Sequence, residues 1–350
     1  MVRDFCMKVS VLVTTYNHEK FIGKALASVL MQKTNFDFEI VIGEDCSTDH
    51  TREIVKEYAI RYPDKVKVLL QPYNMGPPEF PGKNNFIAAF KACKGEYIAI
   101  LDGDDYWTSA NKLQRQVDFL DNHPDCASCF HWADWLDQES GKMRPGLRKG
   151  PPVIKTYYTL DDLLEYGNFI PMASVMFRNK LFGDIPDWYY GVLAGDFVLH
   201  MLNAHYGNIG FIDQAMSVFR GHEGGVNTSL DLAKRCRDSL DFYRVVGSRL
   251  NLQPRKSYRI GVSKFHSMLS TASWADGHTA RALVAGFKAV GIAPLERKLR
   301  VGLRIVAAFI PTTYRFLGVL RHSIMVAAEQ GPCALLVKAY SKLKKSAFRF

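Results

Sequence analysis

Three closely spaced carboxylates are the part of this chain whose chemistry is most readily interpreted. Asp102, Asp104 and Asp105 directly follow the apolar run 97–101. Like charges this close repel one another, and burying any of them alone carries a large desolvation penalty. A divalent cation shared with phosphate oxygens relieves both effects, because Mg²⁺ is typically held by one or two carboxylates together with substrate phosphates. A solvated acidic turn is the common alternative, but the apolar run before it favours a metal site.

Apolar segments alternate with amphipathic ones over the first 122 residues, and this pattern predicts how the acidic turn is positioned. Strands are expected at 9–14, 38–43, 66–70 and 97–101. Helices are expected at 21–31, 85–93 and 112–122, with a further helix that starts after 49 and stops near 63. Near-continuous apolar strands that alternate with helices predict an α/β fold, with a Rossmann-like, mostly parallel central sheet covered by helices on both faces.

Three polar clusters stand where predicted strands end. They are residues 14–17, 44–47 and 102–105. In parallel sheets of this kind, ligands bind beyond the carboxyl ends of the strands. We therefore expect the three clusters to converge on one rim of the sheet.

The pattern is looser after residue 134. The Gly- and Pro-rich segment 138–152 predicts a mobile loop. Further on we expect helices at 160–166 and 196–205, and short strands at 174–177, 209–211 and 216–219. Beyond 229 only helical periodicity is present. This organisation predicts two domains, an α/β domain at 1–230 and a helical region at 231–350.

The net charge of +10 is distributed unevenly between these two regions. Residues 1–230 carry 23 Lys and Arg against 29 Asp and Glu, whereas residues 231–350 carry 22 against 6. Among the basic residues lie two apolar helical stripes, at 295, 299, 303 and 306 and at 336, 340 and 343. Basic amphipathic helices either lie on an anionic membrane surface or pack on a neighbouring domain with their charges solvated. No nucleic-acid partner is expected, because no aromatic-rich binding module is evident.

The cysteines and the hydropathy of the chain indicate the cellular compartment in which it is expected. The seven cysteines are scattered through apolar contexts, which is typical of reduced thiols in a cytoplasmic protein. Cys126 and Cys129 have C-x-x-C spacing but lack a second pair, so a zinc or redox role is not favoured. No signal peptide is visible, and no stretch of about 18 uncharged apolar residues predicts a membrane span. We expect a cytoplasmic protein, at most peripheral on the inner face of the membrane.

Three segments together resemble the family 2 glycosyltransferases of the GT-A fold. They are 11–17, 44–49 and 95–105, the last of which ends in the D-x-D element and the extra Asp105. Each motif alone is weak, but their order and spacing are typical of the family. The resemblance covers roughly the first two-thirds of the chain. It implies a GT-A catalytic domain that transfers a sugar from a nucleotide diphosphate sugar, with inversion at the anomeric carbon and uridine as the expected nucleoside.

The resemblance implies a nucleotide site formed by Thr14, Tyr16, Asp45, Asn85 and Asp102. An Asp side chain can accept a hydrogen bond from uracil N3–H, while an aromatic ring stacks on the face of the base. The alternative for Asp45 is a helix cap or a turn former. For Asn85, as for its neighbour Asn84, the start of a helix is an equally good interpretation.

For the cation, Mn²⁺ or Mg²⁺, the resemblance implies Asp104 as a ligand, with Asp102 near the ribose. Asp105 is an additional carboxylate that Lys112 can neutralise, and its role stays open.

Residues 219–226 resemble the family's R-x-H-x-G-G segment. The resemblance implies His222 as a second metal ligand or a diphosphate contact, and Arg220 as a diphosphate contact. Neutral imidazole ligates divalent ions, and a guanidinium pairs well with phosphate. A lone histidine is more often structural, which is the alternative here.

Asp196 is the expected catalytic base, because residues 185–199 resemble the family segment that holds it. A single carboxylate that opens an apolar helix suits this role, since partial burial raises its proton affinity and the helix fixes its direction. An N-cap is the alternative, and Asp187 is a competing carboxylate more typical of a turn. Trp188 precedes the base and can pack on an acceptor sugar, although core packing is the default for such a ring.

Together these inferences predict a metal-dependent glycosyltransferase, hexosyltransferase-like, that acts on a hydroxyl of a cell-surface or lipid-linked glycan. The alternative is a non-catalytic protein of the same fold that binds nucleotide sugars or carbohydrate. The joint presence of Asp102, Asp104, Asp196 and His222 argues against that alternative. A nucleotidyltransferase is less compatible, because residues 14–19 do not form a Gly-rich basic loop.

Overall fold

The computed structural model describes residues 7–76, 82–145, 153–192, 195–222 and 232–309. The chain divides into two compact units, Met1–Thr228 and Ser229–Phe350. In the described ranges the first unit is α/β and the second is helical. Two features noted in the sequence, the glycines at 224 and 225 and the stripe at 336, 340 and 343, lie outside the described residues.

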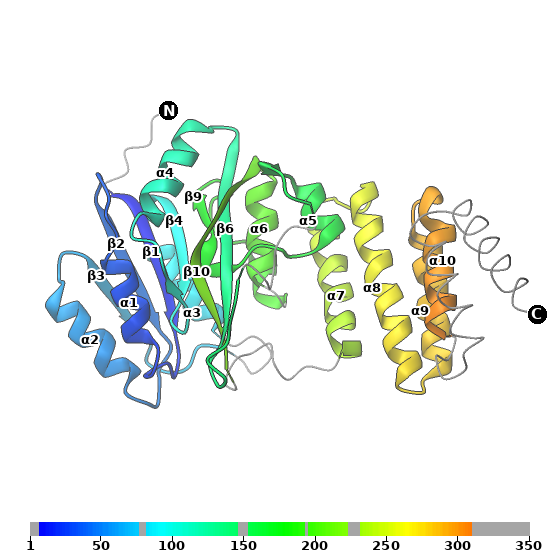
Figure 1. The fold of residues 1–350 in the computed structure, drawn as a ribbon, viewed down its shortest axis with the longest axis horizontal. Helices are drawn as coiled ribbons and strands as arrows, with labels where there is room; N and C mark the ends of the chain where they lie inside the picture. The colour runs from blue at the N-terminus through cyan, green and yellow to red at the C-terminus, as the bar shows by residue number, and fades with distance from the viewer. Residues whose placement is uncertain (1–6, 77–81, 146–152, 193–194, 223–231, 310–350) are drawn as a thin grey trace, which may run out of the picture. The chain divides into compact units, whose positions relative to one another are not determined.

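The first half of the α/β unit is the parallel sheet that the alternation predicts (Figure 1). Its strands are β1 (Met7–Thr15), β2 (Phe38–Glu44), β3 (Val66–Leu70) and β4 (Gly95–Asp102), in the order β3-β2-β1-β4. All three joins between them are parallel. Side chains such as Val11, Leu12 and Ile100 have no exposed surface. Burial on both faces is what a parallel sheet between helices requires.

The helices of this half are α1 (Ile22–Leu30), α2 (Thr51–Arg61), α3 (Lys83–Ala92) and α4 (Lys112–Asn122). Three of them lie close to their predicted bounds. Helix α3 begins at Lys83, two residues before the expected start at 85, because Gly82 adopts a left-handed conformation with φ of +71° and turns the chain into the helix. Glycine takes this conformation without steric penalty.

The second half of the sheet is mixed. Strand β9 (Met176–Arg178) pairs antiparallel with both β4 and β6 (Cys126–Asp137), and β10 (Asn208–Gly221) runs parallel to β6. Three short strands, β5 (Tyr106–Trp107), β7 (Met143–Arg144) and β8 (Tyr157–Tyr158), pair antiparallel with β10, β6 and β10. Two successive antiparallel joins return β6 and β10 to the direction of β4. The carboxyl end of β10 therefore lies on the same rim as the carboxyl end of β4.

Several elements differ from the sequence prediction. The pattern does not predict β6, because Ser128 and His131 interrupt its apolar residues, yet both side chains are buried. The strands expected at 209–211 and 216–219 form one strand, β10, whose pairing with β6 shifts register between Ile212 and Ser217. Ser174, the expected first residue of a strand, instead ends a 3₁₀ helix, η1 (Met172–Ser174). The segment expected as a loop at 138–152 contains β7.

Between β8 and β10 the chain forms α5 (Leu160–Tyr166), η2 (Asp187–Gly191) and α6 (Gly195–Ala204). Helix α5 starts with a capping box in which Thr159 and Asp162 satisfy each other's backbone N–H groups. Helix α6 is buried from Phe197 onward, so only its first turn reaches toward the surface.

The helical unit contains α7 (Leu232–Arg249), α8 (Lys256–Ala275), α9 (Thr279–Ile292) and α10 (Leu295–Phe309), which follow one another as neighbours in Figure 1. Buried serine hydroxyls join α8 to α9: Ser263 Oγ donates to the Ala289 carbonyl at 2.8 Å, and Ser270 Oγ to the Ala282 carbonyl at 2.7 Å. None of the helices in the described ranges has the length and apolar character needed to cross a membrane.

Candidate active site

The acidic turn begins where β4 lies beside the end of β1. Thr14 is the register partner of Asp102, and its hydroxyl donates to Asp102 Oδ1 at 2.9 Å. The N–H of Gly103 donates to the Thr14 carbonyl at 2.8 Å. A Cβ at position 103 would lie 2.7 Å from Thr15 Oγ1 and 2.9 Å from His18 Nδ1. Only glycine fits this close approach, and it lets the next residue, Asp104, lie beside two histidines.

Asp104 contacts His222 from the end of β10 and faces His18 from the loop after β1. The Asp104 Oδ2 atom lies 3.0 Å from His222 Nε2 and 4.0 Å from His18 Nε2. Burial alone would raise the pKa of Asp104, but the hydrogen bond from His222 and the charge of His18 hold that pKa below its usual value. The same hydrogen bond raises the pKa of His222. The structure thus brings the two expected metal ligands together and adds His18, which the sequence interpretation missed.

The Asp105 side chain bonds to the backbone at the end of β10. It is buried, and its Oδ1 accepts a hydrogen bond from the backbone N–H of Arg220 at 2.9 Å. Burial, followed by the charges of Asp104 and Asp102, raises the pKa of Asp105 well above its usual value. Lys112, named from the sequence as a residue that can neutralise Asp105, contacts other groups in the structure. The buried Lys112 ammonium instead donates to Gln116 Oε1 at 2.6 Å and lies 3.9 Å from the ring centroid of Trp107.

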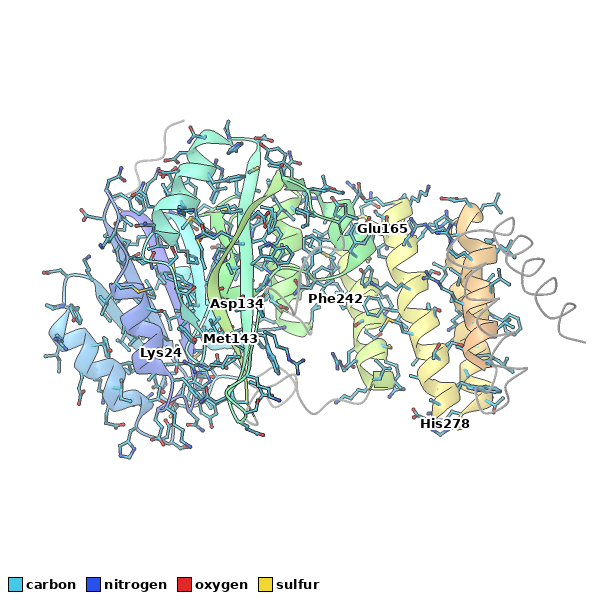
Figure 2. All side chains as sticks on the ribbon, viewed as in Figure 1. Lys24, Asp134, Met143, Glu165, Phe242 and His278 are labelled. Carbon is cyan, nitrogen blue, oxygen red and sulfur yellow. The ribbon has the colours of Figure 1, made fainter. Side chains whose placement is uncertain are left out.

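Arg220 is buried beneath the acidic turn. Its Nη1 donates to Gln138 Oε1 at 2.7 Å, and its guanidinium lies 4.7 Å from the ring centroid of Tyr106. Lys24, labelled in Figure 2, lies over the same Tyr106 ring with its Nζ 3.7 Å from the centroid. These contacts hold the residue before Gly221 and His222 in place. They do not support the expected diphosphate contact of Arg220, which stays a prediction.

The carboxyl ends of β1 and β2 meet as predicted, with Thr15 paired to Glu44. Asp45 follows directly, and its N–H donates to the Thr15 carbonyl at 3.1 Å. Its Oδ1 accepts from the Met75 N–H at 2.7 Å, whereas Oδ2 is buried with no hydrogen-bond partner among the described residues. Burial raises the pKa of Asp45. Tyr16, at the start of the neighbouring loop, is 40% exposed and available to a ligand.

The turn after β2 is held by a buried ion pair. Glu44 has no exposed side-chain surface, and its Oε2 accepts from Arg52 Nε at 2.5 Å while Oε1 accepts from the Ser47 N–H at 2.6 Å. Asn17 Oδ1 accepts from the Thr48 N–H at 2.8 Å, which joins the loop after β1 to the loop after β2. These contacts explain why Glu44 is buried rather than available to a ligand.

Asn85 and Asn84 extend from the first turn of α3 toward this site. Asn85 is buried, and its Nδ2 donates to the Gly43 carbonyl at 2.8 Å while Gln71 Nε2 donates to its Oδ1 at 3.2 Å. Asn84 Nδ2 donates to the Met75 carbonyl at 2.7 Å. Both amides therefore bind the protein's own backbone. They hold the backbone of Met75 and the end of β2 near Asp45. A direct nucleotide contact of Asn85 stays a prediction.

Asp196 stands in the first turn of α6. Its Oδ2 accepts a hydrogen bond from Asn168 Nδ2 at 2.7 Å, and its Oδ1 accepts from the Phe197 N–H at 2.8 Å. The sequence interpretation missed Asn168, which lies two residues after the end of α5. Trp188 lies in η2 and is half-buried, and Asp187 beside it is exposed at the start of the same turn.

The chain is similar to known proteins over much of its length. Residues 10–182 match the family model described as Glycosyl transferase family 2. An uncharacterized protein of Mycobacterium tuberculosis is 35% identical over 219 residues, which cover 62% of this chain and 60% of that protein. The Staphylococcus aureus poly(ribitol-phosphate) beta-N-acetylglucosaminyltransferase TarS is 38% identical over 118 residues, 33% of this chain and 19% of TarS.

Two solved structures share the fold. The crystal structure of TarS 1-349 in complex with UDP-GlcNAc matches with a TM-score of 0.52 and 21% identity, covering 96% of this chain and 92% of that one. The mannosyltransferase PcManGT from Pyrobaculum calidifontis, in complex with GDP-Man and Mn²⁺, matches with a TM-score of 0.53 and 17% identity over 95% of this chain and 86% of that one.

The α/β unit has the GT-A fold of glycosyltransferases. Through its residues 10–182 the chain belongs to glycosyltransferase family 2. The chain spans 60% of the length of the Mycobacterium tuberculosis relative and a smaller share of TarS.

Proposed function

We propose that this protein is a metal-dependent, inverting glycosyltransferase that moves a sugar from a UDP-sugar to an acceptor hydroxyl of a cell-surface or lipid-linked glycan. The observation that carries the proposal is the pairing of Asp104 with His222 at 3.0 Å. This pair lies on the rim where β1, β2 and β4 end, which is where ligands bind in α/β sheets.

The nucleotide is proposed to bind between Tyr16 and Asp45. The buried Oδ2 of Asp45 has no partner among the described residues, and an unsatisfied buried acceptor is costly unless a ligand satisfies it. The N3–H of uracil is such a donor, and the exposed Tyr16 ring offers a face for stacking. TarS has been crystallised in complex with UDP-GlcNAc, which supports a uridine nucleotide. Thr14 and Asp102 would then lie toward the ribose.

The residues of the acidic turn fit a hard divalent cation. One carboxylate, Asp104, and one imidazole, His222, lie within hydrogen-bond distance and would hold Mn²⁺ or Mg²⁺, with Asp102 two residues away. In the described ranges no group of three His, Cys, Asp or Glu could hold a metal ion. A cation at Asp104 and His222 would need further ligands from a diphosphate and water. When bound, such a cation would offset the charge that develops on the departing diphosphate.

Asp196 is proposed to accept the proton of the attacking hydroxyl. Its Oδ2 is oriented by Asn168 at 2.7 Å, and its place in the first turn of α6 fixes the direction of the carboxylate. A single displacement by that hydroxyl inverts the anomeric configuration. Trp188, half-buried just before this helix, is proposed to contact the acceptor sugar.

The acceptor is proposed to be presented at an anionic membrane surface. On α10, Leu295 is 82% exposed, Leu299 60% and Val306 52%. The predicted stripe is therefore exposed at these positions, and Arg300 and Arg304 beside it are also exposed. Exposed apolar residues flanked by cations are typical of helices that bind anionic bilayers. A cytoplasmic protein on the inner face of the membrane would meet lipid-linked acceptors there.

The test is turnover with a panel of UDP- and GDP-sugars in the presence of Mn²⁺, with release of the nucleoside diphosphate as the readout. Asp196→Asn should abolish turnover while leaving the thermal stabilisation by UDP and Mn²⁺ unchanged. Nuclear magnetic resonance of the product should show an inverted anomeric configuration. Binding of a UDP-sugar without hydrolysis or transfer to any acceptor would instead establish the non-catalytic alternative.

A further inference from the structure

A buried lysine at the start of α3 contacts the segment that precedes Asp196. Lys83 is 9% exposed, and its Nζ donates to the carbonyl of Tyr189 at 3.0 Å and to that of Val192. The same ammonium lies 5.1 Å from the centroid of the Tyr189 ring. Burial lowers the pKa of Lys83 to about 8, so most of the group keeps its charge at neutral pH. Charge-assisted hydrogen bonds in a low-dielectric setting are strong, and these hold the end of η2.

Tyr189 also contacts the start of α6. Its side chain is buried, and its hydroxyl fills the space beside Gly195, where a Cβ would lie 2.7 Å from Oη. Burial and the charge of Asp196 both raise the pKa of Tyr189, so the carboxylate acts on this ring electrostatically. Position 195 must therefore be free of a side chain for the Tyr189 ring and the first turn of α6 to pack together. Lys83 thus contacts the residue whose ring packs against Gly195, directly before Asp196.

The residues that follow Lys83 are tied to the nucleotide side of the site. Asn84 binds the carbonyl of Met75, and the Met75 N–H binds Asp45 Oδ1. Asn85 binds the carbonyl of Gly43, at the end of β2. Three consecutive residues in the first turn of α3 thus join the position proposed for the nucleotide base to the helix that holds the proposed catalytic base.

We propose that Lys83 is a positioning residue that sets the first turn of α6, and with it Asp196, relative to the bound nucleotide. It acts through Tyr189 and Val192 and has no role in the chemical step. The expected effect of Lys83 on turnover rests on the proposed function of Asp196. Its expected effect on the local stability of α6 does not. Amide exchange and turnover therefore test the role of Lys83 and the function of Asp196 separately.

The first experiment is hydrogen exchange on the full chain without ligand. Lys83→Met removes the donors while keeping similar bulk. Amides in peptides that cover 186–204 should exchange about tenfold or more faster, because the local opening of this segment becomes easier. Lys112→Met is the matched control, since Lys112 is also a buried lysine but contacts Gln116 and Trp107. Equal exchange of 186–204 in the two variants, or a uniform increase over the whole α/β unit, would overturn the proposal.

The second experiment is steady-state kinetics with the UDP-sugar that the wild type uses. Lys83→Met should lower kcat by about tenfold to a hundredfold and leave the dissociation constant of UDP with Mn²⁺ unchanged, because small displacements of a catalytic group carry penalties of this size. Lys83→Arg, which restores a charged donor, should recover part of kcat. Wild-type protein without turnover would contradict the proposed function alone, and full turnover by Lys83→Met would contradict the role of Lys83 alone.

A second variant keeps the proposal testable if Lys83→Met does not fold. Gly195→Ala leaves Lys83 intact and places a Cβ 2.7 Å from the Tyr189 hydroxyl. It should raise exchange in 186–204 and lower kcat in the same way. Adding Tyr189→Phe removes the clashing oxygen and should restore part of the protection from exchange and part of kcat. Normal exchange and turnover in Gly195→Ala would show that the Tyr189 contact does not position α6.

Discussion

The Oδ2 atom of Asp104 lies 3.0 Å from the Nε2 atom of His222, although the two residues are 118 positions apart in the chain. They meet because β9 stands antiparallel between β4 and β6, which turns β10 so that its carboxyl end lies on the rim where β4 ends. A carboxylate and an imidazole are thereby placed together beside the end of β1. The proposed cation, and through it the binding of a nucleotide, depends on this pair.

The first prediction concerns that pair. Asp104→Ala should abolish the additional thermal stabilisation that Mn²⁺ gives to UDP binding, and His222→Ala should reduce it, because only ligand bound to the folded state raises its apparent stability. Thermal-shift titrations of UDP with and without Mn²⁺ measure this. His50→Ala is the control, since His50 is an exposed imidazole bonded to Glu19. An intact Mn²⁺ effect in Asp104→Ala would place the cation elsewhere.

The second prediction concerns the close approach at Gly103. Gly103→Ala should place its Cβ against Thr15 and His18, displace Asp104 and destabilise the fold by about 1–3 kcal/mol. Nucleotide binding with Mn²⁺ should weaken at the same time. Gly23→Ala is the matched control, because nothing lies within 4 Å of a Cβ there and alanine is favoured within α1. Denaturant unfolding and UDP titration measure both effects, and equal behaviour of the two variants would refute the steric argument.

The third prediction concerns recognition of the base. Asp45→Asn can still accept the Met75 N–H through its amide oxygen but presents an NH₂ group where Oδ2 stood. A donor facing uracil N3–H should weaken UDP binding by about tenfold to a hundredfold, since an unpaired buried donor costs about 1–3 kcal/mol. Calorimetric titration with UDP measures the loss. Unaltered UDP affinity would show that Asp45 does not contact the base.

The same substitution has a pH-dependent effect on stability. Burial raises the pKa of Asp45 in the folded protein, so ionisation opposes folding. Below the unfolded pKa of about 4 both states are protonated and the penalty is absent. It develops as the pH rises through that value and is complete above the raised folded pKa. Asp45→Asn should therefore be more stable than the wild type at pH 7 and approach it near pH 4, as measured by urea unfolding at both pH values.

The fourth prediction concerns the orientation of the proposed base. Asn168→Ala removes the hydrogen bond to Asp196 Oδ2 and should lower kcat by about tenfold, a typical share of what a well-placed general base contributes, with UDP binding unchanged. Asn122→Ala is the control, because the exposed Asn122 amide bonds within α4, to the Asp118 carbonyl. If the two variants turn over equally, Asn168 does not orient the base.

The fifth prediction concerns the exposed stripe on α10. The protein should sediment with vesicles that contain anionic lipid at low ionic strength and should be released as salt rises, because the attraction is screened. Leu295→Ser combined with Leu299→Ser should weaken this binding, whereas Ile60→Ser, at an exposed apolar residue of α2, should not. Absence of binding to anionic vesicles at low salt would remove the membrane hypothesis.

Much of the parallel half of the fold is predictable from the chain, because its strands are mainly apolar and alternate with segments of helical periodicity. Strand β6 is not, since Ser128 and His131 interrupt its apolar residues, and the sequence does not show that both side chains are buried. The sequence also does not predict β10 as a single strand, because the register shift of β10 against β6 interrupts the alternation of side chains along it.

At the candidate site, the sequence indicates which residues can act but not which residues they contact. The motifs predict Asp104 and His222 as metal ligands, and the structure pairs them. Arg220 and Lys112 carry charges that suggest polar roles, yet both are buried against aromatic rings. His18, Lys83 and Asn168 carry no motif that marks them, and each matters only through what it contacts.

The amino-acid sequence by itself determined the class of fold, the rim on which the ligand is expected and the carboxylates that can act there. These depend on local periodicity and on the strand ends, which are properties of neighbouring residues. The tertiary structure alone decided which groups meet: His18 and His222 near Asp104, the Lys83 ammonium at the Tyr189 carbonyl, and the backbone N–H of Arg220 at Asp105. Such contacts join residues distant in the chain, and only the packing of the mixed half of the sheet brings them together.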